Sequence, residues 1–333
     1  MAFKYTQLTL KERYNIEFLI QEGFSNKNIA LRLSRDKSTI GREIRRNSAV
    51  RKNYLADLAT SLARSRSKCE IASKFTPLSK DIIKEKLGLK WTPEQISAYL
   101  KSEYNIFISH ELIYQYINSD RKSGGCLFML LPHRGKKYKK RNIKIRKKIW
   151  KKAAVRKPLS ERPSIAAEKV EIGHWEGDTV ESKSHRGGIA TLVDIKTKYT
   201  VIRKVRDKSS EKMKDAILES FIGCPELIKT LTVDNGSEFA LHDKISKELN
   251  AKVYFANPYS PWERGLNENT NGLIRRFYPK GTDFSMISER ELVKVQNLLN
   301  DRPRKTLGFK TPKELFTKEI LKKEEFRILL KSM

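Results

Sequence analysis

Three carboxylate side chains lie in short stretches whose residue types and spacing suit the binding of divalent metal. They are Asp178, Asp234 and Glu268, and 33 residues separate the second from the third. The surrounding patterns predict a strand, a strand and a helix. Mg²⁺ prefers oxygen ligands and is usually bound by about one or two carboxylates together with water and substrate phosphate. Two such ions about 4 Å apart activate an attacking oxygen and stabilise a leaving one, which is the chemistry of phosphodiester cleavage and transfer.

The two strand acids each have a plainer explanation or a rival. Asp234 precedes Asn235 and Gly236, and this order of residues is common in turns that need no metal. Asp178 has Glu176 two residues before it, on the same face of the expected strand, and Asp194 follows on the next strand. The chemistry therefore depends on all three carboxylates being brought together.

The helix also offers two acids, and the pattern at its start separates them. Residues 260–263 read as a capping box with Pro at the first helical position, which gives Glu263 a structural role. Glu268 lies in the body of the helix, with Arg264 and Arg275 at spacings of four and seven. We expect these two arginines to contact a phosphate backbone; helical salt bridges to Glu268 are the alternative.

The composition predicts a polyanionic partner. Lys and Arg number 69 against 39 Asp and Glu, so the formal net charge is +30. Nucleic acid is the first candidate and anionic membrane the second. No apolar run approaches the roughly 18 residues that cross a bilayer, and the N-terminus has no secretory pattern. We therefore expect a cytoplasmic protein that does not associate with membrane.

Other binding classes are disfavoured by what the sequence lacks. The three cysteines, Cys69, Cys126 and Cys224, are far apart and form no CxxC pair, which argues against a disulfide framework or a zinc site. No phosphate-loop motif of the form GxxxxGK[ST] is found, so no nucleotide cofactor is expected.

Residues 1–52 are predicted to form a helix-turn-helix DNA-binding domain. Thr9 is placed to cap a first helix with Glu12, and Ser25 a second. In the third helix Ile40 and Ile44 face inward, while the residues expected to contact the DNA major groove are Ser38, Thr39, Arg42, Arg45 and Arg46. An ordinary helical hairpin with a solvated basic face is the alternative.

Residues 53–132 are predicted to form a second helical domain that resembles a helix-turn-helix, with Thr92 and Ser109 as helix caps. A purely structural role is nearly as well supported. A basic linker, 133–168, follows, in which 14 of the 24 residues from Arg134 to Lys157 are Lys or Arg. A solvated linker would also account for this composition. Contacts to the DNA backbone are expected from Lys136, Lys137, Lys139, Lys140 and Arg141.

Residues 169–290 are predicted to form an α/β catalytic core. Strands are expected at 174–182, 188–195, 200–205, 228–233 and 253–255, with a helix at 209–221 and another after Pro261. This order matches a ribonuclease H-like fold with a mixed central sheet. A helical segment, 291–333, completes a multidomain chain whose N-terminal region is all-α.

The motifs resemble those of bacterial IS30-family insertion-sequence transposases. The segment 264–284 is similar to the signature of that family, and so are segments 37–47, 174–178, 234–239 and 302–308. Two departures lie in the first helix-turn-helix: Ser34 stands where a turn Gly is usual, and Gly41 replaces a commoner Ser. Gly inside the recognition helix costs about 1 kcal/mol.

The resemblance implies a DDE triad at Asp178, Asp234 and Glu268, with two Mg²⁺ ions per active site and Mn²⁺ able to substitute. It implies binding to double-stranded DNA, both the terminal inverted repeats of an element and a target. Water would first hydrolyse a phosphodiester at the element end, and the freed 3′-hydroxyl would then attack another strand in line, without a covalent protein intermediate. The family route is copy-out, paste-in, through a circle with abutted ends.

Joining two DNA ends implies a homo-oligomer, at least a dimer, associated with the bacterial nucleoid. Two alternatives stay open at this point. One is a non-catalytic, sequence-specific DNA-binding regulator that retains a relic ribonuclease H-like domain. The other is a ribonuclease H acting on RNA, which the two DNA-reading modules disfavour.

Overall fold

The computed structural model describes residues 6–132, 156–183, 187–257 and 265–332, with side chains left undescribed at 67–74 and 323–332. The chain divides into two compact units, Met1–Ile82 and Ile83–Met333. No helix in the described part of the chain is both long enough and apolar enough to cross a membrane.

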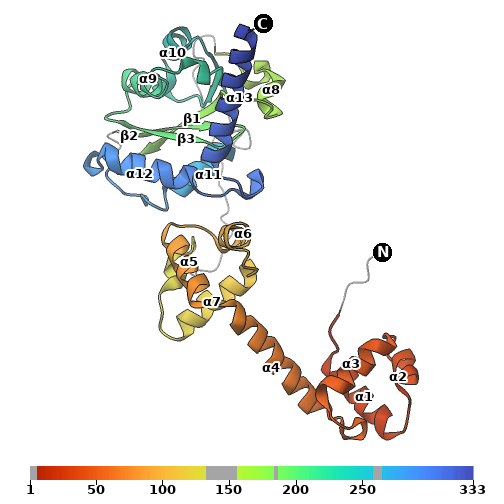
Figure 1. Cartoon of the computed structure of the whole chain (residues 1–333). Helices are drawn as coiled ribbons and strands as arrows, with labels where there is room; N and C mark the ends of the chain where they lie inside the picture. The colour runs from red at the N-terminus through yellow and green to blue at the C-terminus, as the bar shows by residue number, and fades with distance from the viewer. Residues whose placement is uncertain (1–5, 133–155, 184–186, 258–264, 333) are drawn as a thin grey trace. The chain divides into compact units, whose positions relative to one another are not determined.

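The first unit is a small bundle of helices (Figure 1). Its helices are α1 (Leu10–Gln21), α2 (Asn26–Arg32), α3 (Lys37–Asn47) and α4 (Ala56–Lys74), with a 3₁₀ turn η1 (Arg51–Asn53) between the last two. Thr9 and Glu12 form the predicted capping box, and Ser25 caps α2 through the backbone N–H of Asn28. The buried core includes Ile16, Ile29, Ile40 and Ile44. The capped helices predicted for the helix-turn-helix are confirmed.

Two details of this unit bear on the departures noted in the sequence. Ser34 has a φ of +52°, a left-handed conformation in which Gly is favoured. A Cβ added to Gly41 would meet no atom closer than Asn26 Nδ2, at 3.8 Å. The backbone conformation therefore favours Gly at position 34, whereas position 41 has room for a larger side chain.

The second unit is built on a five-stranded mixed sheet. Its strands are β1 (His174–Glu181), β2 (Gly188–Asp194), β3 (Thr200–Val205), β4 (Thr230–Val233) and β5 (Lys252–Phe255), in the order β3-β2-β1-β4-β5. β1, β2 and β3 pair antiparallel, whereas β4 is parallel to both β1 and β5. The predicted mixed central sheet is confirmed.

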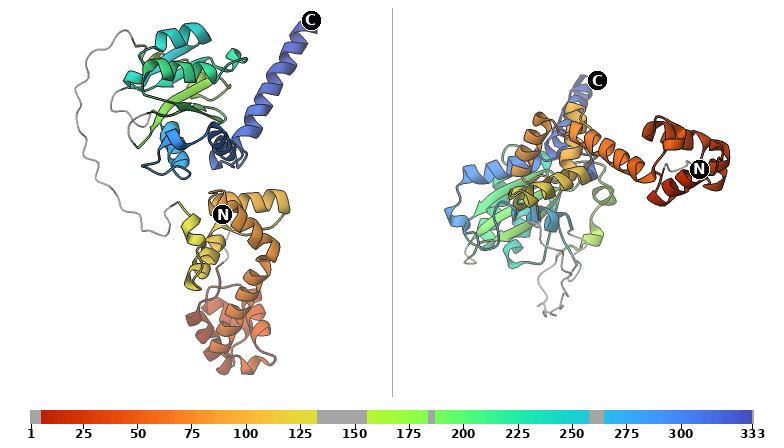
Figure 2. Two further views of the ribbon diagram at one scale, coloured as in Figure 1. Left: turned by 90° about the vertical axis from the view of Figure 1, so that its left-hand side faces the viewer. Right: turned by 90° about the horizontal axis from the view of Figure 1, so that it is seen from below.

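Helices cover both faces of this sheet (Figures 1 and 2). α9 (Ser210–Glu219) and α10 (His242–Leu249) lie on one face, and α11 (Gly265–Ile274) and α12 (Glu289–Asn300) on the other. Side chains alternate along each strand, so Leu192 of β2 joins the core under α9 while Ile189 joins the core under α11 and α12. The result is an α/β core of three layers.

Further helices belong to the same unit. α5 (Pro77–Gly88) crosses from one unit into the other, and α6 (Pro93–Tyr104) and α7 (His110–Lys122) follow it. Thr92 and Gln95 cap α6 as a capping box, and Ser109 caps α7, as predicted. The remaining α-helices are α8 (Ser164–Ala167) and α13 (Pro312–Ser332). The 3₁₀ turns are η2 (Leu127–Leu130), η3 (Leu159–Glu161), η4 (Pro225–Leu227), η5 (Ser237–Phe239), η7 (Phe284–Met286) and η8 (Lys305–Leu307).

The outer edge of β3 is covered by two side chains of α12. Asn300 accepts a hydrogen bond from the backbone N–H of Thr200 and donates one to its carbonyl, both at 2.8 Å. Gln296 accepts from the backbone N–H of Ile202, also at 2.8 Å. These side-chain amides occupy the positions that the backbone of another strand would take.

Candidate active site

The two strand acids lie on, or directly after, neighbouring parallel strands. In the β1–β4 pair, Trp175 is in register with Leu231 and Glu176 with Thr232. Extended two residues beyond its last pair, this register would bring Asp178 beside Asp234, which directly follows β4; neighbouring strands run about 4.8 Å apart. Trp175 and Leu231 point into the core under α9, so the side chains of Asp178 and Asp234 belong to the opposite face, which α11 covers.

The helix that carries Glu268 is fixed against Asp178 by two asparagines. Asn271 Nδ2 donates to Asp178 Oδ2 at 2.7 Å and Asn271 Oδ1 accepts from Thr191 Oγ1 at 3.2 Å. Asn267 is buried and donates to the carbonyl of Gly177 at 3.2 Å. Glu268 directly follows Asn267 and lies one helical turn from Asn271, and its side chain is exposed.

Asp234 lies at the end of β4, in the turn that its neighbours predict. The backbone N–H of Gly236 donates to Asp234 Oδ1 at 2.8 Å, and Asn235 donates to the carbonyl of Ala256 at 2.8 Å. The turn interpretation and the site interpretation of Asp234 are therefore compatible, because the turn holds the carboxylate at the strand end.

A fourth carboxylate, Glu238, lies in the same turn and was missed by the sequence reading. Its Oε1 accepts from Thr179 Oγ1 at 3.4 Å, one residue beyond Asp178. A Cβ at Gly236 would lie 2.3 Å from Glu238 Oε2, so Gly is needed there for this side chain to fold back. The one feature of the sequence that pointed to Glu238 is its position in segment 234–239, which resembles the family signature.

The carboxylates do not converge into one group in this structure. Across the described residues, no three or more His, Cys, Asp or Glu side chains lie close enough together to hold a metal ion. The donor set itself, carboxylate and amide oxygens, is of the kind that Mg²⁺ takes. The backbone thus brings the elements of Asp178, Asp234 and Glu268 together, while Asp178 and Asp234 each bond to a protein N–H.

The rival acids have structural surroundings. Asp194 is completely buried and accepts from the N–H groups of Gly173 and Thr197 and from the Thr197 hydroxyl, at 2.7–3.0 Å. Burial raises the pKa of Asp194 above its usual value, against the effect of these donors. Glu176 is also buried, at 6% exposure. Asp178, by contrast, is partly open to solvent, in the part of β1 that extends past β4.

The predicted DNA-contact residues of α3 lie mostly on its outer side. Ser38, Arg42, Arg45 and Arg46 are exposed, and Thr39 is half-buried. Arg42 donates to the hydroxyl and the carbonyl of Ser38, at 3.0 and 3.2 Å. Arg264 and the predicted linker contacts lie outside the described residues, namely Lys136, Lys137, Lys139, Lys140 and Arg141.

Arg275 differs from the expectation that it is available to a phosphate. Its Nη2 donates to the carbonyl of Glu181 at 2.8 Å and its Nη1 to the carbonyl of Pro279 at 3.4 Å. Burial lowers the pKa of its guanidinium below the usual value. Arg275 therefore ties the end of β1 to the segment after α11.

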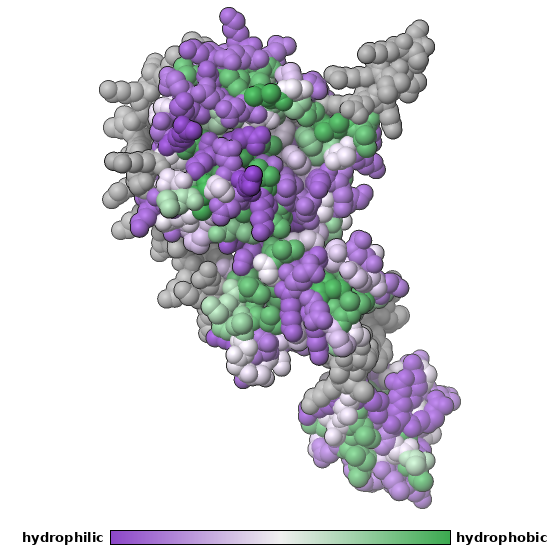
Figure 3. Space-filling model, turned by 60° about the vertical axis from the view of Figure 1, so that its left-hand side comes forward, coloured by the Kyte–Doolittle hydropathy of each residue, from purple (hydrophilic) through white to green (hydrophobic). Residues whose placement is uncertain are grey.

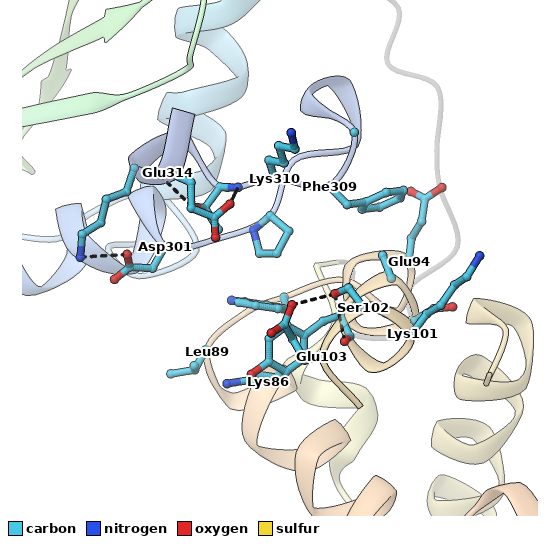
Figure 4. Close-up of a pocket in the computed structure, with 18 of the residues that line it drawn as sticks. Lys86, Leu89, Glu94, Lys101, Ser102, Glu103, Asp301, Phe309, Lys310 and Glu314 are labelled. Atoms are coloured by element: carbon cyan, nitrogen blue, oxygen red, sulfur yellow. Dashed lines mark hydrogen bonds and ion pairs between the residues drawn. The ribbon is translucent and has the colours of Figure 1, made fainter. Parts of the chain in front are cut away.

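A cavity of about 1940 Å³ lies between α6 and the segment around η8, away from the three carboxylates (Figure 4). Its walls mix charges of both signs, such as Lys86 and Lys310 with Glu94 and Asp301. Figure 3 shows a largely hydrophilic surface on the face of the second unit that is drawn there, with smaller hydrophobic areas. None of the three predicted metal ligands, Asp178, Asp234 and Glu268, lines this cavity.

Two buried arginines lie beside that cavity. Arg302 Nε donates to Gln95 Oε1 at 2.9 Å, and Gln95 donates to the carbonyl of Pro303 at 2.6 Å. Burial lowers the pKa of Arg302 to about 9 and that of Arg304 to about 10. Gln95 therefore caps α6 and also joins it to the 302–308 segment, which the capping pattern alone did not predict.

Two parts of this chain match the descriptions of known protein families. Residues 4–47 match the family description "Helix-turn-helix domain", and residues 169–261 match "Integrase core domain". A crystal structure of the catalytic core domain of BIV integrase is similar over 46% of this chain and 98% of that one, with 20% sequence identity and a TM-score of 0.37.

Full-length relatives are more similar. The transposase for insertion sequence element IS4351 of Bacteroides fragilis is 39% identical over 93% of this chain and 95% of its own length. Transposase InsI for insertion sequence element IS30A of Escherichia coli (strain K12) is 37% identical over 94% of this chain and 84% of its own length. Likeness at this level runs through the helix-turn-helix region, the integrase core and the C-terminal segment, and the chain belongs to the IS30 family of insertion-sequence transposases.

Proposed function

We propose that this protein binds the terminal inverted repeats of its insertion sequence and catalyses metal-dependent cleavage and transfer of DNA strands. Asp178, Asp234 and Glu268 would be the ligands of two Mg²⁺ ions. The observation that supports the proposal is the register of β1 and β4, whose extension by two residues would bring Asp178 and Asp234 together on the face covered by the helix of Glu268.

The ions, when bound, would supply charge stabilisation to the attacking and leaving oxygens of the phosphodiester. The contribution of the chain is to hold its carboxylates in place. Asn271 orients the Asp178 carboxylate through the 2.7 Å hydrogen bond, and the Gly236 N–H orients that of Asp234. Closure of the site would require the side chain of Glu268, which is exposed, to turn toward Asp178.

DNA would be held by separate parts of the chain. The exposed Ser38, Arg42, Arg45 and Arg46 of α3 would enter the major groove of the element end. Residues 133–168 would bind backbone phosphates, with binding that weakens strongly as salt rises. Since two DNA ends must be joined, at least a dimer would act.

A non-catalytic DNA-binding regulator is the second candidate. The observation that favours it is the separation of the carboxylates, because no metal-binding group of three acids forms in the described residues. Such a protein would use α3 in the same way but would leave DNA intact.

One experiment separates the two. Purified protein is mixed with a short duplex carrying the element's terminal repeat and Mg²⁺, and the position of any cut is mapped. The proposal expects a Mg²⁺-dependent cut at the element end that is lost in Asp178→Ala and in Glu268→Ala. Nicking that survives both substitutions would contradict the assignment, and an RNA–DNA hybrid run in parallel tests ribonuclease H activity.

A further inference from the structure

A second, smaller pocket lies directly beside Asp178. It has a volume of about 520 Å³ and is lined by residues 179–183 at the end of β1, by Asn271 and Arg275 of α11, and by Lys280 and Gly281 beyond it. We call it the β1–α11 pocket. Asn271 forms part of its wall and also binds the Asp178 carboxylate, so the pocket and the candidate active site share a side chain.

Protein contacts fix the walls of this pocket in place. Arg275 bonds to the carbonyls of Glu181 and Pro279. The N–H of Lys183 donates to the carbonyl of Thr282 at 3.1 Å, and the buried hydroxyl of Ser182 accepts from the N–H of Phe284 at 3.2 Å. The pocket is therefore bounded by two segments that are cross-linked to each other.

The charges that line the pocket favour an anion. Lys183, Arg275 and Lys280 are cationic, and the one acid among the lining residues, Glu181, is paired with Lys208. Lys183 and Lys280 are exposed, and within the described residues neither ammonium group makes a hydrogen bond or an ion pair at close range. Asp283 interacts with Lys183 at longer range: the hydrogen bonds from Ser285 and, to a smaller extent, the charge of Lys183 lower the pKa of the Asp283 carboxyl. Arg275 is engaged by the walls, so the two lysines are the groups available to a ligand.

We infer that the β1–α11 pocket binds a phosphate group of the DNA strand undergoing cleavage, next to the phosphodiester that is cut. This inference rests on the proposed function, because it takes the scissile group to lie at Asp178. Lys183 and Lys280 contact the phosphate oxygens, and Arg275 is a positioning residue. The volume is many times the roughly 30 Å³ that one water molecule takes up, so a sugar–phosphate unit can enter.

This assignment separates two cationic roles on the same face of the sheet. Arg275, which the sequence singles out by its spacing from Glu268, shapes the pocket without needing to touch DNA. Lys183 and Lys280 come from segments that are far apart in the sequence, and both line the pocket because Arg275, the Lys183 N–H and the Ser182 hydroxyl join those segments. The phosphate would thereby fix the distance of the strand from Asp178.

The test uses the full chain and a set of repeat-bearing duplexes, each with one phosphate near the cut replaced by a neutral methylphosphonate. Binding is measured without divalent metal, so that no chemistry occurs, and cleavage is measured with Mg²⁺. The variants are the pair Lys183→Ala with Lys280→Ala, and the charge-preserving pair Lys183→Arg with Lys280→Arg. The matched control is Lys244→Ala with Lys247→Ala, two exposed lysines of α10 on the opposite face of the sheet.

We expect one methylphosphonate position within a few nucleotides of the cut to weaken binding by the wild-type protein and by the control and arginine variants. The Lys183→Ala, Lys280→Ala variant should bind all duplexes equally, with the slope of log K against log salt reduced by about 1 to 2. The inference is overturned if no position matters to the wild type, or if the double alanine variant keeps the wild-type pattern. Failure of the wild type to cut any duplex with Mg²⁺ would instead reject the proposed function, since the binding pattern is measured separately.

Discussion

Asn271 donates a 2.7 Å hydrogen bond to the carboxylate of Asp178 across 93 residues of sequence. The side-chain oxygen of Asn271, Oδ1, accepts a hydrogen bond from the hydroxyl of Thr191, which lies on β2, next to the strand of Asp178. One side chain of α11 therefore connects the helix of Glu268 to two adjacent strands. The position of the helix and the orientation of the Asp178 carboxylate are set by the same contact.

The first prediction concerns this contact. Asn271→Ala removes the donor to Asp178 and leaves the Thr191 hydroxyl without that acceptor, so the cleavage rate should fall by about 10- to 100-fold, the usual cost of losing a residue that orients a metal ligand. The cleavage rate is measured against Mg²⁺ concentration, and the affinity for DNA without metal should stay within about twofold. Asn269→Ala, an exposed neighbour on the same helix, is the control and should behave as wild type. A loss confined to DNA affinity would show that Asn271 acts elsewhere.

The second prediction concerns the three acids themselves. Asp178→Asn, Asp234→Asn and Glu268→Gln keep size and hydrogen bonding but remove a charged ligand, which should lower the cleavage rate by about 10³-fold or more, since metal stabilisation amounts to several kcal/mol. Gel-shift affinity for the repeat should be kept. Asp243→Asn removes an acid that is exposed on α10 and serves as the control. Wild-type cleavage in any one of the three variants would remove that residue from the site.

The third prediction is that the stability of the second unit depends on pH through His174, which joins β1 to β4. His174 is buried at the start of β1 and bonds to Thr230 of β4, and burial lowers the pKa of His174 below its usual 6.5. Because the folded pKa lies below the unfolded one, the neutral histidine stabilises the fold above about pH 6.5, and this contribution is lost as the pH falls through the folded pKa. Stability should therefore decrease between pH 8 and pH 5.

Urea unfolding followed by tryptophan fluorescence measures this effect in the second unit, since Trp91, Trp150, Trp175 and Trp262 all belong to residues 83–333. His174→Gln should be less stable at pH 8 and should lose part of the pH dependence. His110→Gln changes an exposed histidine of α7 and should leave the curve unaltered. Equal slopes in wild type and His174→Gln would rule out His174 as the source.

The fourth prediction concerns the recognition helix. Gly41→Ala should stabilise α3 by about 1 kcal/mol, because Ala is the better helix former and the added Cβ meets no close neighbour. This stabilisation corresponds to amide exchange that is about fivefold slower. Hydrogen exchange of peptides covering α1 to α3 in the full chain provides the measurement. Gly23→Ala is the contrasting control: its φ of +80° strains any other residue, so exchange there should accelerate. Faster exchange in Gly41→Ala would mean that the glycine is needed for packing.

Local patterns predicted the elements well, because caps and strand alternation depend on residues close in sequence. The capping boxes at Thr9 and Thr92 involve a residue three positions on, and both are present. The 19-residue α4 was not predicted. Residues 53–132 were expected to form a second helical domain, but no helix bounds were predicted before about residue 78, and α4 packs against both α1 and α3.

The candidate site was predictable as a set of acids but not as a set of contacts. Asp178, Asp234 and Glu268 follow from residue type and strand order. The partners that hold Asp178 and Asp234 do not, since neither the Asn271 amide nor the Gly236 N–H carries chemistry that a sequence pattern marks. The contacts of Arg275 were also not predicted: its spacing suggested DNA, and its guanidinium bonds to two carbonyls of its own chain.

The carboxamides of Asn300 and Gln296 also determine where this chain can be shortened. A fragment that stops near residue 290 would keep all five strands but strip β3 of its cover, leaving donors and acceptors in a row that a second molecule can extend. Strand edges of this kind nucleate aggregation. A soluble fragment of the core must therefore continue through α12. The residues that follow Glu268 thus prevent the exposed edge of β3 from pairing with the same edge of a second molecule.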